Sequence, residues 1–482
     1  MNASIGVIEG CSGAAALWPS IDWAKVERSV SRLQARIVKA VQADRWHRVR
    51  SLQRLLRKSL AAKLLAVRRV TSNRGKATAG IDGVILKTPT AKWQSALKLN
   101  TKDYQPKPLR RIYIPKKNGK RRAIGIPTQA DRCEQALDLL ALDPVSETLA
   151  DPCSYGFRKA RSPQDAMARG FNVLARKASA AWILEGDIKA CFDQLSHDWI
   201  LRNTPTDPDR LRQWLKAGFL ESHHLHPTDQ GTAQGGIISP TVANMALDGL
   251  HGQLRRHLGT RRKVNLVRFA DDFIITGATE ALLRDEVKPL VIDFLRARGL
   301  ELSEEKTRIV HIDTGFDFLG FNFRKHGGKL LIKPAKSSIA SVVTRLKEIF
   351  RVGRQWPQRD VIRAANPVIR GWGQYYRHVV SKEVFNRIDC MIWRLTWNWA
   401  KRRHSHRPRS FIKARYYTRR GGRDWIFSDG EETLFLLTSI PIRRHVQIRE
   451  YTNPYDPNDA AYLAQRRSGF PGVFQYSIGS AP

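Results

Sequence analysis

The sequence predicts a mixed α+β fold, with antiparallel strands in the middle of the chain and amphipathic helices toward both ends. In two stretches, 181–197 and 264–277, β-branched and large apolar residues lead into aspartates, which is typical of strands that end at a polar site. Before residue 70, apolar residues recur at three- and four-residue spacing among Lys and Arg, which indicates amphipathic helices. From Lys333 onward the chain is again helical in character, basic and rich in tryptophan.

The excess of positive charge indicates what kind of partner the protein binds. The 482 residues include 83 Lys and Arg but 44 Asp and Glu, which gives a formal net charge of +39. The charge is spread over the whole length, and a compact chain so charged repels itself unless a counter-charge is bound. We therefore expect an extended polyanionic partner, with nucleic acid favoured over the alternative of a generally basic protein.

Cysteine usage and hydropathy favour a reduced, intracellular protein. No C-x-x-C pair occurs among the five cysteines, so neither a disulfide framework nor a zinc ribbon is predicted: Cys11, Cys133, Cys153, Cys191 and Cys390. No apolar run approaches the roughly 18 residues of a spanning helix, and the first residues lack a basic leader. We expect a cytoplasmic, nucleic-acid-associated protein without membrane contact, and the residues predict no oligomeric state.

Two amphipathic helices are predicted in the N-terminal part. One follows Asp22 as far as Val41, and a second runs from Leu52 to Leu65. The basic residues on the polar face of the second helix suit RNA contact and an ordinary solvated face about equally. The stretch Thr71–Gly83 is rich in Gly, Ser, Asn and Thr, and we expect it to be a loop.

A β-hairpin is predicted next. Ile112 and Ile114 alternate with polar residues before an Asn118-Gly119 turn, and the alternation resumes afterwards. Five cations decorate the tip: Lys116, Lys117, Lys120, Arg121 and Arg122. They suit a grip on a triphosphate or on a template backbone, with a solvated basic hairpin as the alternative.

Acidic residues follow the two predicted strand regions. Asp271 and Asp272 lie at the turn of the hairpin over 264–277, and Asp187 follows the apolar run of residues 182–184. Adjacent carboxylates near an apolar core repel one another and lose hydration, and a divalent cation offsets both effects. An exposed Asp-Asp turn is common by itself. Together, the two stretches predict three carboxylates that hold two Mg²⁺ ions for phosphoryl transfer.

Two further segments suit contact with nucleic acid. In the stretch 231–244, Gly235-Gly236 allows close backbone approach and Ser239-Pro240 starts a helix, which suits a surface against a base or a template strand. Basic residues alternate with aromatic ones over 366–406, a pattern that can contact phosphates and stack on unpaired bases. We expect most of these tryptophans to lie in the core, and residues 453–482 to be loosely ordered.

With these motifs in place, the chain resembles the group II intron-encoded reverse transcriptases, also called maturases, over about residues 61–417. The motifs follow the family's order: RIYIPKKNGKRRAIGIP, SYGFR, EGDIKACFDQLSH, TAQGGIISPTVAN, RFADDF, GLELSEEKT, FDFLGF and RGWGQYYRH. The resemblance implies a right-hand polymerase, with fingers and palm built on an antiparallel sheet and a helical thumb. The implied domains are 1–85, an N-terminal helical extension; 86–325, fingers and palm; 326–420, thumb or maturase; and 421–482, a C-terminal region with a candidate DNA-binding remnant.

The same resemblance assigns roles to individual residues. Asp187 and Asp271 would bind both metal ions, and Asp272 would complete the catalytic site. Phe192 would exclude a ribose 2′-hydroxyl and so select deoxynucleotides. The remaining nucleotide-binding residues implied are Lys116, Lys117, Arg122, Gln234, Gly235 and Lys306. Contact with RNA is expected at Arg370, Arg377, Lys401, Arg402 and Arg403.

The implied function is RNA-directed DNA polymerisation by a protein that binds group II intron RNA, assists its splicing and copies it during retromobility. The implied partners are the intron RNA, an RNA template with a DNA primer, deoxynucleoside triphosphates and target DNA. Phe269 departs from the family's usual Tyr, and the paired cysteines of an endonuclease domain are missing after Cys390, so we expect that domain to be absent. A splicing-only maturase and a domesticated or defence-associated reverse transcriptase are the alternatives.

Overall fold

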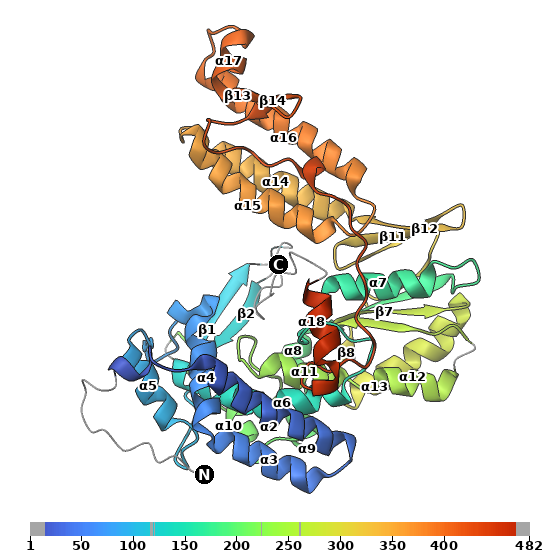
Figure 1. Cartoon of the computed structure of the whole chain (residues 1–482). Helices are drawn as coiled ribbons and strands as arrows, with labels where there is room; N and C mark the ends of the chain where they lie inside the picture. Colours follow the sequence, from blue (N-terminus) through green and yellow to red (C-terminus); the bar gives the residue numbers. More distant parts are fainter. Residues whose placement is uncertain (1–14, 116–118, 120, 223, 260–261, 469–482) are drawn as a thin grey trace.

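The computed structural model describes residues 15–115, 119, 121–222, 224–259 and 262–468. A lower body holds the N-terminal helices and the central sheets, and a helical arm rises from it (Figure 1). Among the helices of the described ranges, none is both long enough and apolar enough to cross a bilayer.

Helices dominate both ends of the chain, and strands occupy its middle. The helical elements are α2 (Trp23–Gln42), α3 (Trp46–Lys58), α4 (Leu60–Ser72), η1 (Arg74–Ala77), α5 (Pro89–Lys98), α6 (Gln129–Leu149), α7 (Pro163–Leu174), α8 (Cys191–Gln194), α9 (His197–Asn203), α10 (Pro208–Leu215), α11 (Ser239–Leu247), α12 (Leu250–Leu258), η2 (Leu282–Val287), α13 (Lys288–Arg296), α14 (Lys336–Val352), α15 (Gln358–Tyr376), α16 (Lys382–Arg403), α17 (Arg409–Tyr416), η3 (Leu437–Ser439), η4 (Pro457–Asp459) and α18 (Ala460–Ser468). The strands are β1 (Leu109–Pro115), β2 (Arg121–Ile126), β3 (Trp182–Lys189), β4 (Phe219–Glu221), β5 (His224–His226), β6 (Leu266–Phe269), β7 (Asp272–Gly277), β8 (Glu301–Leu302), β9 (Arg308–His311), β10 (Phe316–Phe318), β11 (Phe321–His326), β12 (Lys329–Pro334), β13 (Tyr417–Arg420) and β14 (Arg423–Phe427).

The N-terminal helices form a small bundle around α6. Asp22 caps α2 by accepting a hydrogen bond from Lys25 N at 3.0 Å. The second predicted helix, Leu52–Leu65, is wrong as a single element, because Ser59 has extended backbone (ψ 127°) that ends α3 and precedes α4. Both helices contact α6, so the break lets two apolar faces reach one neighbour.

Two sheets carry the central part of the chain. The first has the order β2-β1-β4-β5, and its β1–β2 hairpin pairs Ile112 with Ile124, which confirms the predicted hairpin. The second, called the palm sheet here, has the order β6-β7-β3-β8, with β9 also pairing β3. Its strand pairs are antiparallel, as expected from the sequence.

The palm sheet is covered on both faces. Ile183, Val267 and Ile274 lie in one hydrophobic cluster, which continues through the β10-β11-β12 sheet into the arm of α14, α15 and α16. Leu184, Leu266 and Ile275 alternate with them along the same strands and lie in a second cluster with α11, α12 and α13. The alternation therefore anchors the arm on one face and a helical layer on the other.

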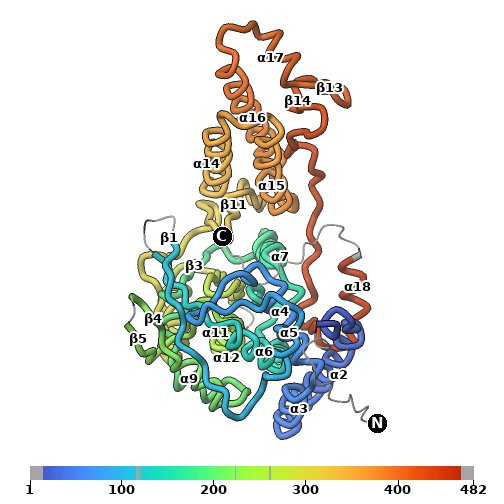
Figure 2. Tube along the Cα trace, turned by 90° about the vertical axis from the view of Figure 1, so that its left-hand side faces the viewer, coloured from blue at the N-terminus to red at the C-terminus, as the bar shows by residue number. Residues whose placement is uncertain are grey.

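The segment after η3, residues 441–468, is named the C-terminal strap. It leaves the arm, descends along the body and ends in α18 beside it (Figures 1 and 2). Tyr455 donates to Asp143 Oδ2 at 2.8 Å and Asn453 Nδ2 donates to Thr148 Oγ1 at 2.9 Å, so the strap is fastened to α6. The expectation of a loosely ordered end is thus wrong for residues 453–468, because their polar side chains find partners on the body.

Asp165 is the main anchor of the strap. Its buried carboxylate accepts from Ile448 N at 2.8 Å and Arg466 Nη2 at 2.7 Å, and His445 Nε2 lies 3.0 Å from the same oxygen. Burial by itself raises the pKa of Asp165. The hydrogen bond and charge of His445 and the charge of Arg466 outweigh it and lower the pKa to about 2.

We predict that Asp165→Asn lowers the free energy of unfolding by about 3 kcal/mol at neutral pH, because it leaves the largely buried guanidinium of Arg466 without its carboxylate partner. The folded-state pKa lies below the unfolded value of about 3.9, so the contribution is full above that pH and disappears as pH falls toward 2. Urea titrations of both proteins from pH 6 downward measure it. Asp313→Asn, at an exposed aspartate, is the matched control, and equal shifts in both variants would contradict the prediction.

Candidate catalytic site

The three predicted carboxylates lie together at one end of the palm sheet. Asp187, near the end of β3, pairs in register with Asp272, the first residue of β7. Asp271 lies in the tight turn between β6 and β7, where Ala270 has a φ of +57°. The prediction that these aspartates, separate in sequence, converge is therefore correct for their positions on the sheet.

A glycine makes the close pairing of β3 and β7 possible. A Cβ added to Gly186 would lie 2.2 Å from the ring of Phe273, its cross-strand partner. Real side chains do not approach so closely, so the Phe273 ring fills the space that a side chain at position 186 would need. The register that sets Asp187 beside Asp272 depends on this packing.

Ionisation is disfavoured at two of these carboxylates, those of Asp271 and Asp272. Desolvation, followed by the charges of Asp271 and Asp187, raises the pKa of Asp272 to about 7, although the residue is in part exposed to solvent. Desolvation also raises the pKa of Asp271, and the charge of Asp187 adds to it. Oxygen-donor groups whose ionised forms are disfavoured, here those of Asp271 and Asp272, suit a hard divalent cation, which would stabilise those forms.

The positively charged ammonium group of Lys306 lies beside the carboxylates. Its Nζ lies 2.7 Å from Asp187 Oδ2, and this hydrogen bond is the leading cause of a raised pKa for Lys306. Within the described ranges, no group of three or more His, Cys, Asp or Glu side chains is arranged to hold a metal ion. The backbone thus brings the carboxylates together, while the side chain of Asp187 is engaged by Lys306.

Buried polar residues support the catalytic turn from behind. Arg268, on β6, is 1% exposed, and its Nη1 donates to Ala270 O at 3.3 Å and to Asn244 Oδ1 at 3.2 Å. It also forms an ion pair with Asp248. A Cβ on Gly156 would lie 2.4 Å from Ala270 N, so the chain at 156 presses directly on the turn.

Sequence reasoning missed this support. An arginine between apolar neighbours in the predicted strand 264–269 was the available signal, since a charge inside a buried strand requires partners. Those partners, Asn244 and Asp248, come from the region of α11 and could not be paired with Arg268 without the fold.

Phe192 lies just beyond the end of β3, on the short helix α8. Ala190 turns the chain with a φ of +44° and places Phe192 next to Phe157, with ring centroids 6.3 Å apart in an edge-to-face arrangement. Phe157 itself has a φ of +56° and comes from the SYGFR motif. The sequence singled out Phe192, whereas the contact with Phe157 emerges from the fold alone.

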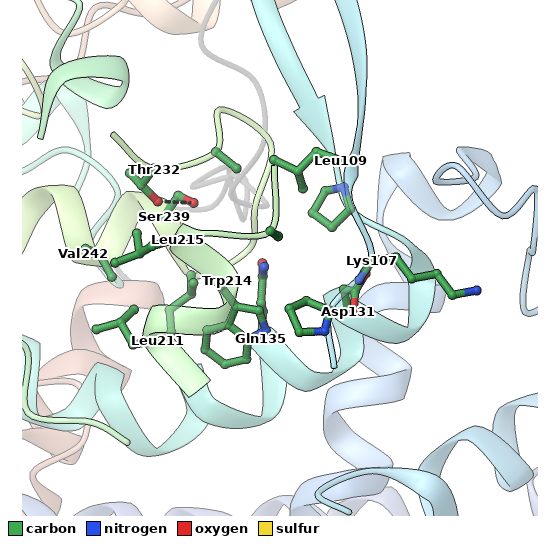
Figure 3. A pocket seen from close by; sticks show the side chains of 15 residues that line it. Lys107, Leu109, Asp131, Gln135, Leu211, Trp214, Leu215, Thr232, Ser239 and Val242 are labelled. Atoms are coloured by element: carbon green, nitrogen blue, oxygen red, sulfur yellow. Dashed lines mark hydrogen bonds between the residues drawn. The ribbon is translucent and has the colours of Figure 1, made fainter. Parts of the chain in front are cut away.

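The loop with Gln234 and Gly235 packs against the end of β2. Gly125 N donates to Gln234 O at 2.9 Å, and a Cβ on Gly235, whose φ is +128°, would lie 2.6 Å from Gly125 O. On the other side, Gln135 Oε1 accepts from Ile237 N at 2.8 Å. Figure 3 shows the small pocket behind this loop, with the Thr232–Ser239 hydrogen bond of 2.9 Å at its edge.

The basic hairpin tip is described in part. Lys116 and Lys117 lie outside the described residues. Arg122 is exposed on β2, opposite Ile114, and its charge lowers the pKa of Asp271 against the dominant effect of desolvation. The field of Arg122 therefore reaches the carboxylates, which lie on a different sheet.

The cations expected to contact RNA lie on the arm, away from the carboxylates. Arg370 lies on α15 and is exposed, with its guanidinium 4.9 Å from the Phe435 ring; Arg377 directly follows the helix and is half-buried. Lys401 and Arg402 are exposed at the end of α16. Arg403 is engaged instead, because it lies 4.2 Å over the Trp399 ring and donates to Arg354 O at 3.1 Å.

Tryptophans of the arm divide into two groups. Trp399 is 4% exposed, in agreement with the expected core role. Within residues 366–406, Trp393 is 40% exposed and departs from the expectation, whereas Trp372 and Trp397 are partly buried and pack against the core. Trp425 and Trp356, which lie outside that stretch, are 36% and 38% exposed. Helical spacing identified the packed face but could not show which rings the short β13–β14 hairpin leaves open.

Three family models match successive parts of the chain. The N-terminal domain of reverse transcriptase matches residues 18–99, and the reverse transcriptase (RNA-dependent DNA polymerase) domain matches 114–323. The group II intron maturase-specific domain matches residues 339–417. The matches follow one another in the order expected from the motifs.

The chain is also similar to curated proteins and solved structures. Protein YkfC of Escherichia coli K12 is 30% identical over 338 residues, covering 60% of this chain and 87% of that protein. The group II intron-encoded protein LtrA of Lactococcus lactis subsp. cremoris is 29% identical over 360 residues, covering 58% of this chain and 59% of LtrA. Among solved structures, apo telomerase from Candida tropicalis aligns at a TM-score of 0.39 and 13% identity, covering 62% of this chain and 64% of that chain.

The family models confirm the expected fold class, with fingers and palm followed by a helical thumb. Reverse transcriptases generally use divalent metal ions, and the reverse transcriptase and maturase families bind RNA. The chain therefore belongs to the family of group II intron-encoded reverse transcriptases, or maturases, and is an RNA-directed DNA polymerase.

Proposed function

We propose that this protein binds a group II intron RNA, assists its splicing and copies it into DNA during retromobility, using Asp187, Asp271 and Asp272 as the catalytic carboxylates. The observation that carries the proposal is the register of the palm sheet, which sets Asp187 opposite Asp272 beside the turn at Asp271. The substrates in this proposal are an RNA template, a DNA primer and deoxynucleoside triphosphates. Target DNA is the further partner.

Catalysis in this proposal is mainly positioning and electrostatics. Two Mg²⁺ ions held by the three aspartates would activate the primer 3′-hydroxyl and neutralise the pyrophosphate leaving group. The turn keeps the carboxylates in place, because Arg268 donates a hydrogen bond to Ala270 O and the backbone at Gly156 packs closely against Ala270 N. The raised pKa values of Asp271 and Asp272 support this use, because a bound cation would stabilise their ionised forms.

Residues around the carboxylates would receive the nucleotide. Lys306 exchanges its contact with Asp187 for a phosphate oxygen when the triphosphate enters, and Arg122 contributes a second positive charge from the fingers. Lys116 and Lys117 would extend that grip. Gln234 and Gly235 would line the nucleotide and template, and Phe192, braced by Phe157, would meet the sugar at C2′.

The thumb would contact RNA through Arg370, Arg377, Lys401, Arg402 and Arg403. Arg370 on α15 and Lys401 and Arg402 on α16 are exposed and suit phosphate contacts, and a net charge of +39 supports an extended polyanionic partner. A splicing-only maturase would need this surface and not the carboxylates. Three aspartates at one sheet end would repel an RNA backbone, so their presence favours polymerisation over the splicing-only alternative.

We predict that Asp271→Asn abolishes primer extension on an RNA template while RNA affinity is unchanged or raised, since the change removes a metal ligand and one negative charge. Primer extension with Mg²⁺ and a filter-binding titration measure the two effects. Asp198→Asn, at an exposed aspartate on α9, is the matched control and should leave both unchanged. Residual extension near the native rate would contradict the carboxylate assignment.

Replacing Phe192 with alanine should admit ribonucleotides, because the ring that meets the 2′-hydroxyl is gone. Single-nucleotide incorporation with each sugar gives the ratio of kcat/KM, and we expect that ratio to fall by at least about tenfold, a difference of ~1.4 kcal/mol. Phe192→Leu, which keeps most of the bulk, should retain discrimination. Unchanged selectivity in the alanine variant would remove Phe192 from this role.

RNA binding should weaken steeply with salt. Each neutralised phosphate contributes a slope of roughly −0.7 to −0.9 to a plot of log affinity against log salt concentration. Titrations of Asp271→Asn with intron RNA at several salt concentrations measure the slope without turnover. A flat response would show that contacts with the phosphate backbone do not dominate.

A further inference from the structure

Three tryptophans at the outer end of the arm form a cluster, named the tryptophan platform here: Trp393, Trp397 and Trp425. The rings of Trp393 and Trp397 are nearly parallel, with an interplanar angle of 8° and centroids 6.1 Å apart. Trp425 meets both of them edge-on, at 6.0 Å and 5.6 Å. Figure 1 shows the elements concerned, α16 and the β13–β14 hairpin, at the end of the arm far from the palm.

Two of the three tryptophans of the platform are exposed to solvent although they are large and apolar, and the third, Trp397, packs against the core of the arm. Trp393 is 40% exposed and Trp425 is 36% exposed. The neighbouring Trp399 shows what packing alone produces on the same helix, since it is 4% exposed and donates its indole N–H to Gly353 O at 2.8 Å. The open rings are thus not needed to fill the core of the arm.

Trp425 has a strained backbone conformation within the cluster. Its φ is +65°, a left-handed conformation that is unfavourable for a bulky residue, and the pairing of β13 with β14 is irregular between Thr418 and Arg420. Strained residues of this kind persist where the surroundings over-determine them, and they concentrate at binding sites. Contacts of Trp425 with Trp393, Trp397 and Tyr417 stabilise this strained conformation.

Cations border the platform. Lys413 Nζ lies 4.9 Å from the Trp425 ring centroid. Exposed arginines lie on the elements that carry the platform or adjoin it, namely Arg394, Arg415, Arg419, Arg420 and Arg423. The acidic residue of the hairpin, Asp424, lies 3.9 Å from Arg419 Nε and is thus paired. The surroundings therefore favour a polyanion with flat, stackable groups.

We propose that the tryptophan platform binds unpaired bases of RNA, with the surrounding cations on the adjoining phosphates. The proposal deepens the RNA-binding part of the proposed function and rests on it. Stacking on an indole tolerates any base, so the platform would secure a single-stranded loop by shape and charge rather than by sequence. The second strand of the hairpin and Trp425 lie beyond residue 417, where the maturase-domain match ends.

The test uses the full-length protein and a single-stranded oligoadenylate carrying one 2-aminopurine, whose fluorescence is quenched when the base stacks. Native protein should quench it. Trp393→Ala and Trp425→Ala should each weaken binding by roughly 5- to 150-fold, the effect expected for one stacked base. Trp356→Ala, at an equally exposed tryptophan outside the platform, is the matched control and should bind as the native protein does.

Extension of an annealed primer on an RNA template separates this proposal from the polymerase assignment. Both platform variants should keep the native kcat, because the platform is remote from the carboxylates. Unchanged single-strand affinity in both variants would overturn the platform, and so would an absence of quenching when native protein is bound, whatever the variants do. Loss of extension in Asp271→Asn would be unaffected by either result.

Discussion

Repulsion among Asp187, Asp271 and Asp272 is the constraint on which the rest of this structure depends. The palm sheet sets the three carboxylates together, and desolvation, followed by the charges of Asp271 and Asp187, raises the pKa of Asp272 to about 7. Such an arrangement persists because rigid packing surrounds it: Gly186 under the Phe273 ring, Gly156 against the turn, and Arg268 beneath it. The unfavourable free energy of placing the carboxylates together is thus offset by the buried contacts around them.

The body and the arm share one core rather than meeting at a small interface. One face of the palm sheet continues through β10, β11 and β12 into α14, α15 and α16, and the C-terminal strap returns from the arm to α6 and α7. The position of the thumb relative to the carboxylates is therefore fixed twice, by apolar packing and by the buried charge of Asp165. A polymerase must hold primer and template at a constant distance from its catalytic groups, and this double attachment suits that requirement.

The arrangement of positively charged side chains differs between the catalytic site and the arm. Near the carboxylates, single cations such as Lys306 and Arg122 act on individual acidic groups. On the arm, arginines and lysines are exposed in larger numbers and lie beside open aromatic rings. Single cations thus partly neutralise individual carboxylates at the catalytic site, whereas the arm presents a broader basic surface for a polyanion.

The sequence by itself determined the fold class, the order of the motifs and the three carboxylates, because apolar runs that adjoin aspartates and Gly-marked turns are local signals. It also determined the β1–β2 hairpin, whose register follows from its own alternation. The tertiary structure alone decided the break at Ser59, the partners of Arg268, the contact between Phe157 and Phe192, and the order of the strap. It also decided which tryptophans stay open. Each of these depends on pairs far apart along the chain, and the residue pattern at one position carries no information about which distant side chain will satisfy it.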